Sequence, residues 1–185
     1  MNAIDALTRR VSGRAMVEPA PNNDELDVIL SSALRAPDHG RLHPWKFIVI
    51  KGKGRDRLGE VMVESFKISN TNATDQQIDK ERAKPLRAPL IVAVCAMVNK
   101  QSKIPVIEQL FSAAAAAQNI MIASFALGFG CAWKTGDSAY DDNIKRLLGL
   151  ADTDSIVGFM YIGTNERELE SAPKLEHNLF VSFFE

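Results

Sequence analysis

The chain shows two kinds of hydrophobic pattern, continuous apolar runs and a helical spacing of apolar residues. Together they predict helices that interrupt a small β-sheet. Residues 90–98 (LIVAVCAMV) and 156–162 (IVGFMYI) are almost continuously apolar, which is typical of strands covered on both faces. A third segment follows the i, i+3, i+4 spacing of a helix, with apolar side chains at Leu26, Ile29, Leu30, Ala33 and Leu34. Helices and strands do not alternate regularly, so the pattern predicts an α+β class, with a single domain over residues 1–185.

The same patterns predict the remaining elements. Shorter strands are expected over residues 45–51 and 131–134, and helices over residues 3–10, 55–69 and 105–128. A turn at Gly52 to Gly54 closes the first of these strands.

Capping residues and breakers set the expected limits of the helices. Asn22 or Asn23, with Glu25 after it, can cap the helix that Pro37 ends. Asp137 or Ser138 can cap a helix that runs through Leu148. The polar residues 70–83 predict a mobile loop followed by a charged helix, and the apolar residues 180–184 predict a strand-like end.

Composition narrows the class of protein. The chain has 185 residues, 46% of them hydrophobic and 24% charged, with a formal net charge of −1. No basic run with interleaved aromatic residues is present, which disfavours nucleic-acid binding. The apolar stretch 104–129 holds too many polar side chains, such as Glu108 and Gln109, for a membrane span. The first residues lack the apolar core of a signal peptide, and Cys95 and Cys131 form no CxxC motif, so a reducing cytoplasm is the predicted location.

Three basic segments are candidates for a site that binds an anionic, ring-bearing ligand. The loop at 35–43 carries Arg35, His39 and Arg41, and residues 133–136 form a second basic-aromatic turn. Arg10 and Ser12 follow the first helix, and an arginine fork with a hydroxyl suits phosphate oxygens. Each segment taken alone also has a simpler interpretation. Arg10 can belong to a solvated helix end, the residues at 35–43 can form an ordinary polar loop, and Trp133 can be a core residue.

Other kinds of site are disfavoured by the motifs. Residues 128–135 (GFGCAWKT) resemble a phosphate-binding loop, but Trp133 stands where a glycine is needed and a strand follows. Gly52 to Gly54 lacks the third glycine of a dinucleotide-binding fingerprint. No nucleophile elbow, paired catalytic carboxylates or metal-ligand spacing is found, so we expect no bound metal and no side-chain nucleophile.

The combination of motifs resembles the nitroreductase family of FMN-dependent oxidoreductases, in particular its short YdjA-like branch. The matching residues are Arg10-Val11-Ser12 before Glu18-Pro19, Arg35-Ala36-Pro37, Pro44-Trp45-Lys46-Phe47, the turn Gly128 to Trp133, and residues 156–163. The loop between Asp38 and His43 departs from the larger family members, with Arg41 and His43 at the positions of an asparagine and a glutamine. The ends of the loop therefore support the resemblance, and its centre is where we expect the protein's own substrate preference.

The resemblance implies a nitroreductase-like fold with a central, mainly antiparallel sheet flanked by helices, in an intertwined homodimer with FMN at the interface. It places Arg10, Val11 and Ser12 at the flavin phosphate and ribityl chain. The loop that carries Arg35, His39 and Arg41 would approach the cofactor. This loop can come from the same subunit or from its partner. Trp133, Lys134 and Thr135 would complete the site. Nicotinamide nucleotide would meet Ala123, Ser124, Phe125, Ala126, Leu127 and Gly128.

The function that this resemblance implies is an NAD(P)H-dependent flavin oxidoreductase. Hydride would pass from NADH or NADPH to flavin N5, and two electrons would then pass to a nitroaromatic, a quinone or another small acceptor. A cofactor that carries the chemistry explains why no catalytic side chain is found. Two alternatives stay open, an FMN storage or sensor module with little turnover and a flavin-dependent dehydrogenase.

Overall fold

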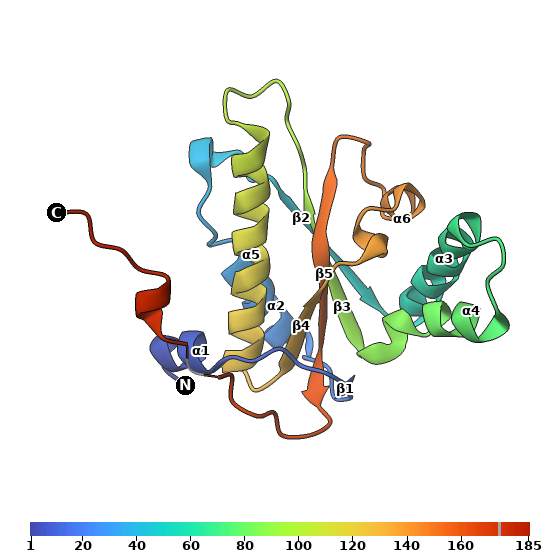
Figure 1. The fold of residues 1–185 in the computed structure, drawn as a ribbon, viewed down its shortest axis with the longest axis horizontal. Helices are drawn as coiled ribbons and strands as arrows, with labels where there is room; N and C mark the ends of the chain where they lie inside the picture. The colour runs from blue at the N-terminus through green and yellow to red at the C-terminus, as the bar shows by residue number, and fades with distance from the viewer. Residues whose placement is uncertain (174) are drawn as a thin grey trace.

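A five-stranded sheet forms the centre of the computed structural model, which describes residues 1–173 and 175–185 (Figure 1). The long strand β5 (Ser155–Asn165) pairs with β3 (Leu90–Ala96), and β3 pairs in turn with β2 (Trp45–Lys51). The short strands β4 (Gly130–Lys134) and β1 (Met16–Val17) also pair with β5. All of these pairings are antiparallel, as predicted; the two-residue β1 was not expected from the sequence.

Helices cover both faces of this sheet. Helices α2 (Asn23–Ala33) and α5 (Val106–Ala126) pack on one face. Helices α3 (Lys53–Ser69) and α6 (Asp142–Leu147) pack on the other, and α4 (Asp75–Arg82) lies against α3. The first helix, α1 (Ala3–Arg9), contacts α5. Short 3-10 helices occur at His39–Arg41, Lys84–Arg87, Asp137–Ala139 and His177–Leu179. This arrangement confirms the predicted α+β class.

The central strand β3 is buried on both faces, as its continuous apolar run predicted. Leu90, Val92 and Val94 point toward α2 and α5. Ile91, Ala93 and Cys95 point toward α3 and α6. None of the seven residues of β3 is more than 2% exposed. The same alternation continues through β5 and β4, and it decides which side of the sheet each candidate site residue faces.

Of the two helix starts for which caps were predicted, that of α2 is confirmed. Asn22 forms a complete capping box with Glu25 at the start of α2. Within the polar segment 70–83, Thr74 and Gln77 form another capping box and start α4, which confirms the expected charged helix. Helix α3 begins at Lys53, so the turn after β2 is shorter than expected.

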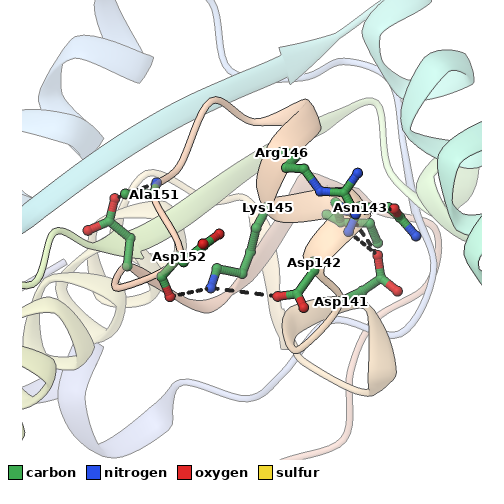
Figure 2. A network of polar contacts seen from close by, with 9 residues as sticks. Asp141, Asp142, Asn143, Lys145, Arg146, Ala151 and Asp152 are labelled. Carbon is green, nitrogen blue, oxygen red and sulfur yellow. Dashed lines mark hydrogen bonds and ion pairs between the residues drawn. The ribbon is translucent and has the colours of Figure 1, made fainter.

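The expected cap of the helix before Leu148 was wrong. Asp137 and Ser138 belong to a separate 3-10 turn, and Asp141 caps α6 by accepting hydrogen bonds from the backbone N–H groups of Asn143 and Ile144, both at 2.9 Å. Figure 2 shows this network, in which Lys145 Nζ also donates to the Asp152 carbonyl at 2.9 Å. Gly136, at φ +60°, turns the chain into the 3-10 segment and so delays the helix.

Helix α5 is the longest helix on the face of the sheet that it covers with α2. Among the described residues it is the one helix long and apolar enough to cross a membrane by length and composition. Its small side chains Ala116 and Ala117 are fully buried in the core that it forms with α2 and the sheet, which is the packing of a core helix.

The strand-like end expected at residues 180–184 is not formed within this chain. After the 3-10 turn His177–Leu179 the chain leaves the body of the molecule without pairing (Figure 1). Phe183 is 86% exposed and Phe184 fully exposed. A strand needs a free sheet edge beside it, and the tail runs away from its own sheet.

Candidate functional site

A hollow lined by positively charged side chains lies on the α3 side of the sheet, where β4 ends. Its volume is about 220 Å³, and its polar rim is formed by Arg14, Lys84, Arg87, Lys134 and Thr135. Met16, Met62, Phe159 and Tyr161 form its apolar walls. We call this hollow the cationic pocket. A ring system can pack on such walls while an anionic group meets the rim.

Asp137 also lines the cationic pocket, so its cations are only partly compensated. Lys84 Nζ pairs with Glu81 at 2.5 Å. Among the described residues, no carboxylate forms an ion pair with Arg14, Arg87 or Lys134. Burial raises the pKa of Tyr161 to about 12, although the charge of Arg87 opposes this, so the phenol stays a neutral hydrogen-bonding group. The cationic side chains that line the pocket outnumber its one carboxylate, Asp137, which favours an anionic ligand.

The alternation of β4 places Trp133 and Lys134 on opposite faces of the sheet. Lys134 reaches the cationic pocket, whereas Trp133 packs with the cluster of α2 and α5. The Trp133 indole Nε1 donates to the Val157 carbonyl at 3.1 Å. A side chain at Gly158 would collide with this indole. Trp133 therefore shapes the strand that carries Lys134 and Thr135, and only these two line the pocket.

The segment after α1 lies alongside β4. The backbone N–H of Gly13 donates to the Cys131 carbonyl at 3.0 Å. Arg10 is half-buried, and its Nη1 is buried with no hydrogen-bond partner in the described chain. Val11 and Ser12 line a broad groove of about 740 Å³ against residues 166–173, and Arg14 lines both this groove and the cationic pocket. The structure thus brings Val11, Ser12, Lys134 and Thr135 to two adjoining hollows.

The loop at 35–43 lies at the other end of α5. His39 Nδ1 contacts Glu108 Oε2 at 2.5 Å, and Glu108 is in the first turn of α5. Residues 10–12 lie near Cys131, beyond the last turn. A helix of 21 residues spans roughly 30 Å. Arg35, His39 and Arg41 are all exposed, and the length of α5 separates His39 from Arg10 within one chain.

The backbone of this loop is fixed in an uncommon conformation. Arg41 (φ +53°) and His43 (φ +49°) both occupy the left-handed region, which costs energy for residues other than glycine. Asp38 compensates, because its carboxylate accepts hydrogen bonds from the backbone N–H groups of Leu42 at 3.2 Å and His43 at 2.7 Å. The backbone at the centre of the loop is therefore held in one conformation.

The expected nicotinamide segment forms the C-terminal end of α5 and the turn after it. Ala123 and Ser124 are buried, and Phe125 is half-buried. Ala126, Leu127 and Gly128 are exposed. Only the last three can meet a ligand without rearrangement.

The two cysteines are free and buried. Burial raises the pKa of Cys131 to about 12, although the charge of Arg10 and the neighbouring Ser124 hydroxyl act in the opposite direction. Such a thiol is a poor nucleophile. Within residues 1–173 and 175–185, no three potential metal-ligating side chains come together.

Of the residues that line the cationic pocket, sequence reasoning identified only Lys134 and Thr135 as site residues, and it missed Lys84, Arg87, Phe159 and Tyr161 among others. Lys84 and Arg87 lie on a 3-10 turn that follows a strongly charged helix, where their charge looked like ordinary surface charge. Arg14 was visible as a third arginine after α1 but carried no motif of its own. Because side chains alternate between the two faces of a strand, the sequence could have placed Phe159 and Tyr161 on the same face of β5. It could not have shown that this face lines a pocket.

Comparisons with known proteins agree with one another. The sequence profile of the Nitroreductase family matches residues 7–164. The chain is 36% identical over 185 residues to an Escherichia coli K12 protein named "Putative NAD(P)H nitroreductase YdjA", with 100% of both chains covered. It is 30% identical over 171 residues to a similarly named protein of Haemophilus influenzae, with 92% of each covered.

Solved structures show the same fold. A nitroreductase-like protein of Bacillus cereus superimposes with a TM-score of 0.85 at 23% identity, covering 100% of this chain and 97% of the other. A Desulfovibrio desulfuricans structure described as in complex with FMN gives a TM-score of 0.74 at 19% identity, covering 99% and 97%. The family profile and the full-length relative, together with this fold, show that the chain belongs to the nitroreductase family.

Proposed function

We propose that this protein is an NAD(P)H oxidoreductase that uses bound FMN to reduce a nitroaromatic, a quinone or another small acceptor. The observation that carries the proposal is the cationic pocket, in which Arg14, Arg87 and Lys134, none of them in an ion pair within the described part of the chain, surround apolar and aromatic walls. Relatives named as NAD(P)H nitroreductases, and a similar fold solved with FMN, support the same choice of cofactor and electron donor.

The residues present fit FMN by their chemistry. Its phosphate needs arginine, lysine or hydroxyl donors, and Arg10, Ser12 and Lys134 offer these on adjoining segments. The buried Nη1 of Arg10 has no partner in the described chain, so an anion beside it would gain a charged hydrogen bond at little cost. Phe159, Tyr161 and two methionines offer packing surface for a flavin ring. When bound, FMN would supply the electron transfer.

We propose that the site is completed by the partner subunit of a homodimer. Pockets that hold a whole cofactor are usually about 300–1,000 Å³, and the cationic pocket of one chain measures about 220 Å³. The loop with Arg35, His39 and Arg41 lies too far from that pocket in its own chain to close it. A second copy would bring its loop to the pocket, and the exposed Phe183 and Phe184 would find a surface on the partner.

The roles of the chain's own residues follow from this arrangement. Arg10, Val11 and Ser12 would bind the phosphate and ribityl end, and Lys134 and Thr135 would hold the opposite side. Trp133 would act from behind the sheet by fixing β4. The partner's loop would exclude water and place a cation near the flavin edge, where negative charge develops on reduction.

The nicotinamide nucleotide would meet the exposed end of α5. Ala126 and Leu127 offer apolar contact there, whereas the helix C-terminus disfavours phosphate groups. We therefore propose contact with the nicotinamide or ribose part and not with the pyrophosphate. Both thiols are free and buried, which suits the reducing cytoplasm that we propose as the location.

The visible spectrum of the purified protein tests the proposal. A flavin spectrum that bleaches on anaerobic addition of NADH or NADPH, followed by steady NAD(P)H oxidation with an added quinone, is expected. One slow reduction without turnover would instead indicate a storage or sensor module. Lys134→Ala should weaken FMN binding, and Lys100→Ala, an exposed lysine in the turn before α5, serves as the matched control. Equal FMN affinity in both variants would contradict the assigned pocket.

A further inference from the structure

The contact between His39 and Glu108 joins two segments that lie 69 positions apart in the sequence. His39 Nδ1 lies 2.5 Å from Glu108 Oε2, and the side chains are 64% and 39% exposed. A carboxylate only accepts hydrogen bonds, so Nδ1 must carry the proton in this contact. The remaining nitrogen, Nε2, is then the only one free to meet a ligand.

The backbone on both sides of this contact is also fixed. Gly40, at φ +75°, packs so closely on Ile104 that an added Cβ would lie 3.0 Å from the Ile104 side chain. Gln109, next to Glu108, is 1% exposed. Its carboxamide accepts from the Asn99 N–H at 2.8 Å and donates to the Asn99 and Ile104 carbonyls, both at 3.0 Å. The first turn of α5 therefore holds the turn with Ile104 and, through it, the loop that bears His39.

We infer that Glu108 is a positioning residue that fixes the His39 ring, so that His39 Nε2 is presented as a single defined hydrogen-bonding group to the ligand at the subunit interface. This inference rests on the proposed function, in which the loop of one subunit covers the FMN of its partner. The flavin edge carries both N–H and C=O groups, and a ring with one fixed free nitrogen can bind such an edge at a defined angle. Fixing a ligand-binding imidazole through its other nitrogen is a general device of binding sites.

A surface ion pair without this role would behave differently. Exposed pairs of this kind contribute little to stability, and their removal would leave ligand binding unchanged. A positioning role predicts the reverse, with a small effect on folding and a clear effect on the ring orientation of His39 and on FMN affinity.

The first test uses the protein without FMN and reads the histidine ring directly. The chain has three histidines, and His39→Ala identifies the signals of His39 in a ¹⁵N-histidine NMR spectrum. Under conditions in which ordinary imidazoles are neutral, His39 is expected with its proton on Nδ1. Glu108→Ala should move the proton to Nε2 or give a mixture of both forms. An Nε2–H ring in the unmodified protein, or no change in Glu108→Ala, would overturn the inference.

The second test measures FMN affinity and flavin midpoint potential in the full dimer. Losing one hydrogen bond at the flavin edge should weaken FMN binding roughly 2- to 10-fold. Glu108→Ala and His39→Ala should give similar losses and shift the potential in the same direction. The double variant should be no weaker than His39→Ala alone, because both changes remove one interaction. Glu108→Gln should retain part of the affinity, since the amide oxygen still accepts from Nδ1.

Asp24→Ala is the matched control, because Asp24 is an exposed acid in the first turn of α2 with no side-chain partner among the described residues. It should leave FMN affinity and midpoint potential unchanged. Additive losses in the double variant would overturn the positioning role. A wild-type protein that binds no FMN at all would refute the proposed function, and the NMR measurement would still decide whether Glu108 fixes the His39 ring.

Discussion

Replacing Arg10 with alanine should separate the binding of FMN from the stability of the fold. Arg10 is half-buried, and its Nη1 has no hydrogen-bond partner in the described chain. A buried donor without a partner contributes nothing favourable to the folded protein. Its natural partner under the proposed function is the FMN phosphate.

Arg10→Ala should therefore have a large effect on FMN affinity and a small effect on the free energy of unfolding. A hydrogen bond to a charged group contributes about 1.5–3 kcal/mol, so Arg10→Ala should raise the dissociation constant for FMN roughly 10- to 150-fold. The free energy of unfolding of the FMN-free protein should change by less than about 1 kcal/mol, because no native hydrogen bond to Nη1 is lost.

The assay is a fluorescence titration of FMN into FMN-free protein, with urea unfolding of the same samples. Arg9→Ala is the matched control, since Arg9 is an exposed neighbour in the last turn of α1, and it should change neither quantity appreciably. A folded Arg10→Ala variant with wild-type FMN affinity would remove Arg10 from the site. A large loss of stability without FMN would show that Arg10 is a structural residue.

Three further predictions concern the groups around the site. Stability should fall as the pH rises from about 9 to about 12, because the folded protein keeps protons that the unfolded chain releases in this range; pH-dependent urea unfolding measures this loss, and a flat profile would contradict it. The groups responsible are Cys95, Cys131 and Tyr161, whose pKa values burial raises to about 12 from 9.0, 9.0 and 10.0. Gly158→Ala should cost about 1–3 kcal/mol, because its Cβ would collide with the indole of Trp133; an unchanged melting temperature and tryptophan fluorescence would show that the indole can move aside freely. Truncation after Asn178 should yield a chain that is poorly soluble or free of flavin, since it removes the exposed aromatic tail; a truncated protein that stays dimeric in light scattering and retains FMN would refute the exchanged-tail arrangement.

Local sequence patterns were enough to predict most of the elements. The buried strands β3 and β5 followed from continuous apolar runs, and α2 followed from its helical spacing and the capping box at Asn22. The cap of α6 was mistaken, because Asp137, Ser138 and Asp141 are all acceptable capping residues. The left-handed Gly136 and the tertiary placement of the 3-10 turn selected the third.

The candidate site was only partly accessible from the sequence. The motifs identified Arg10, Ser12 and Lys134, which lie on segments around β4. They did not identify Lys84 or Arg87, whose charges are ordinary until η2 (Lys84–Arg87) packs beside the end of β4. The sequence also left open whether the loop at His39 meets Arg10 within one chain or across two, and the structure shows that α5 separates them within one chain.

The sequence by itself determined the buried strands and the start of α2, because these depend on residues a few positions apart. It also determined the family, through motifs spread along most of the chain. The tertiary structure alone decided which charges share a pocket and that Glu108 meets His39 across 69 positions. Such contacts depend on strand register and on helix packing across the sheet, where a shift of one residue would turn Lys134 away from the cationic pocket.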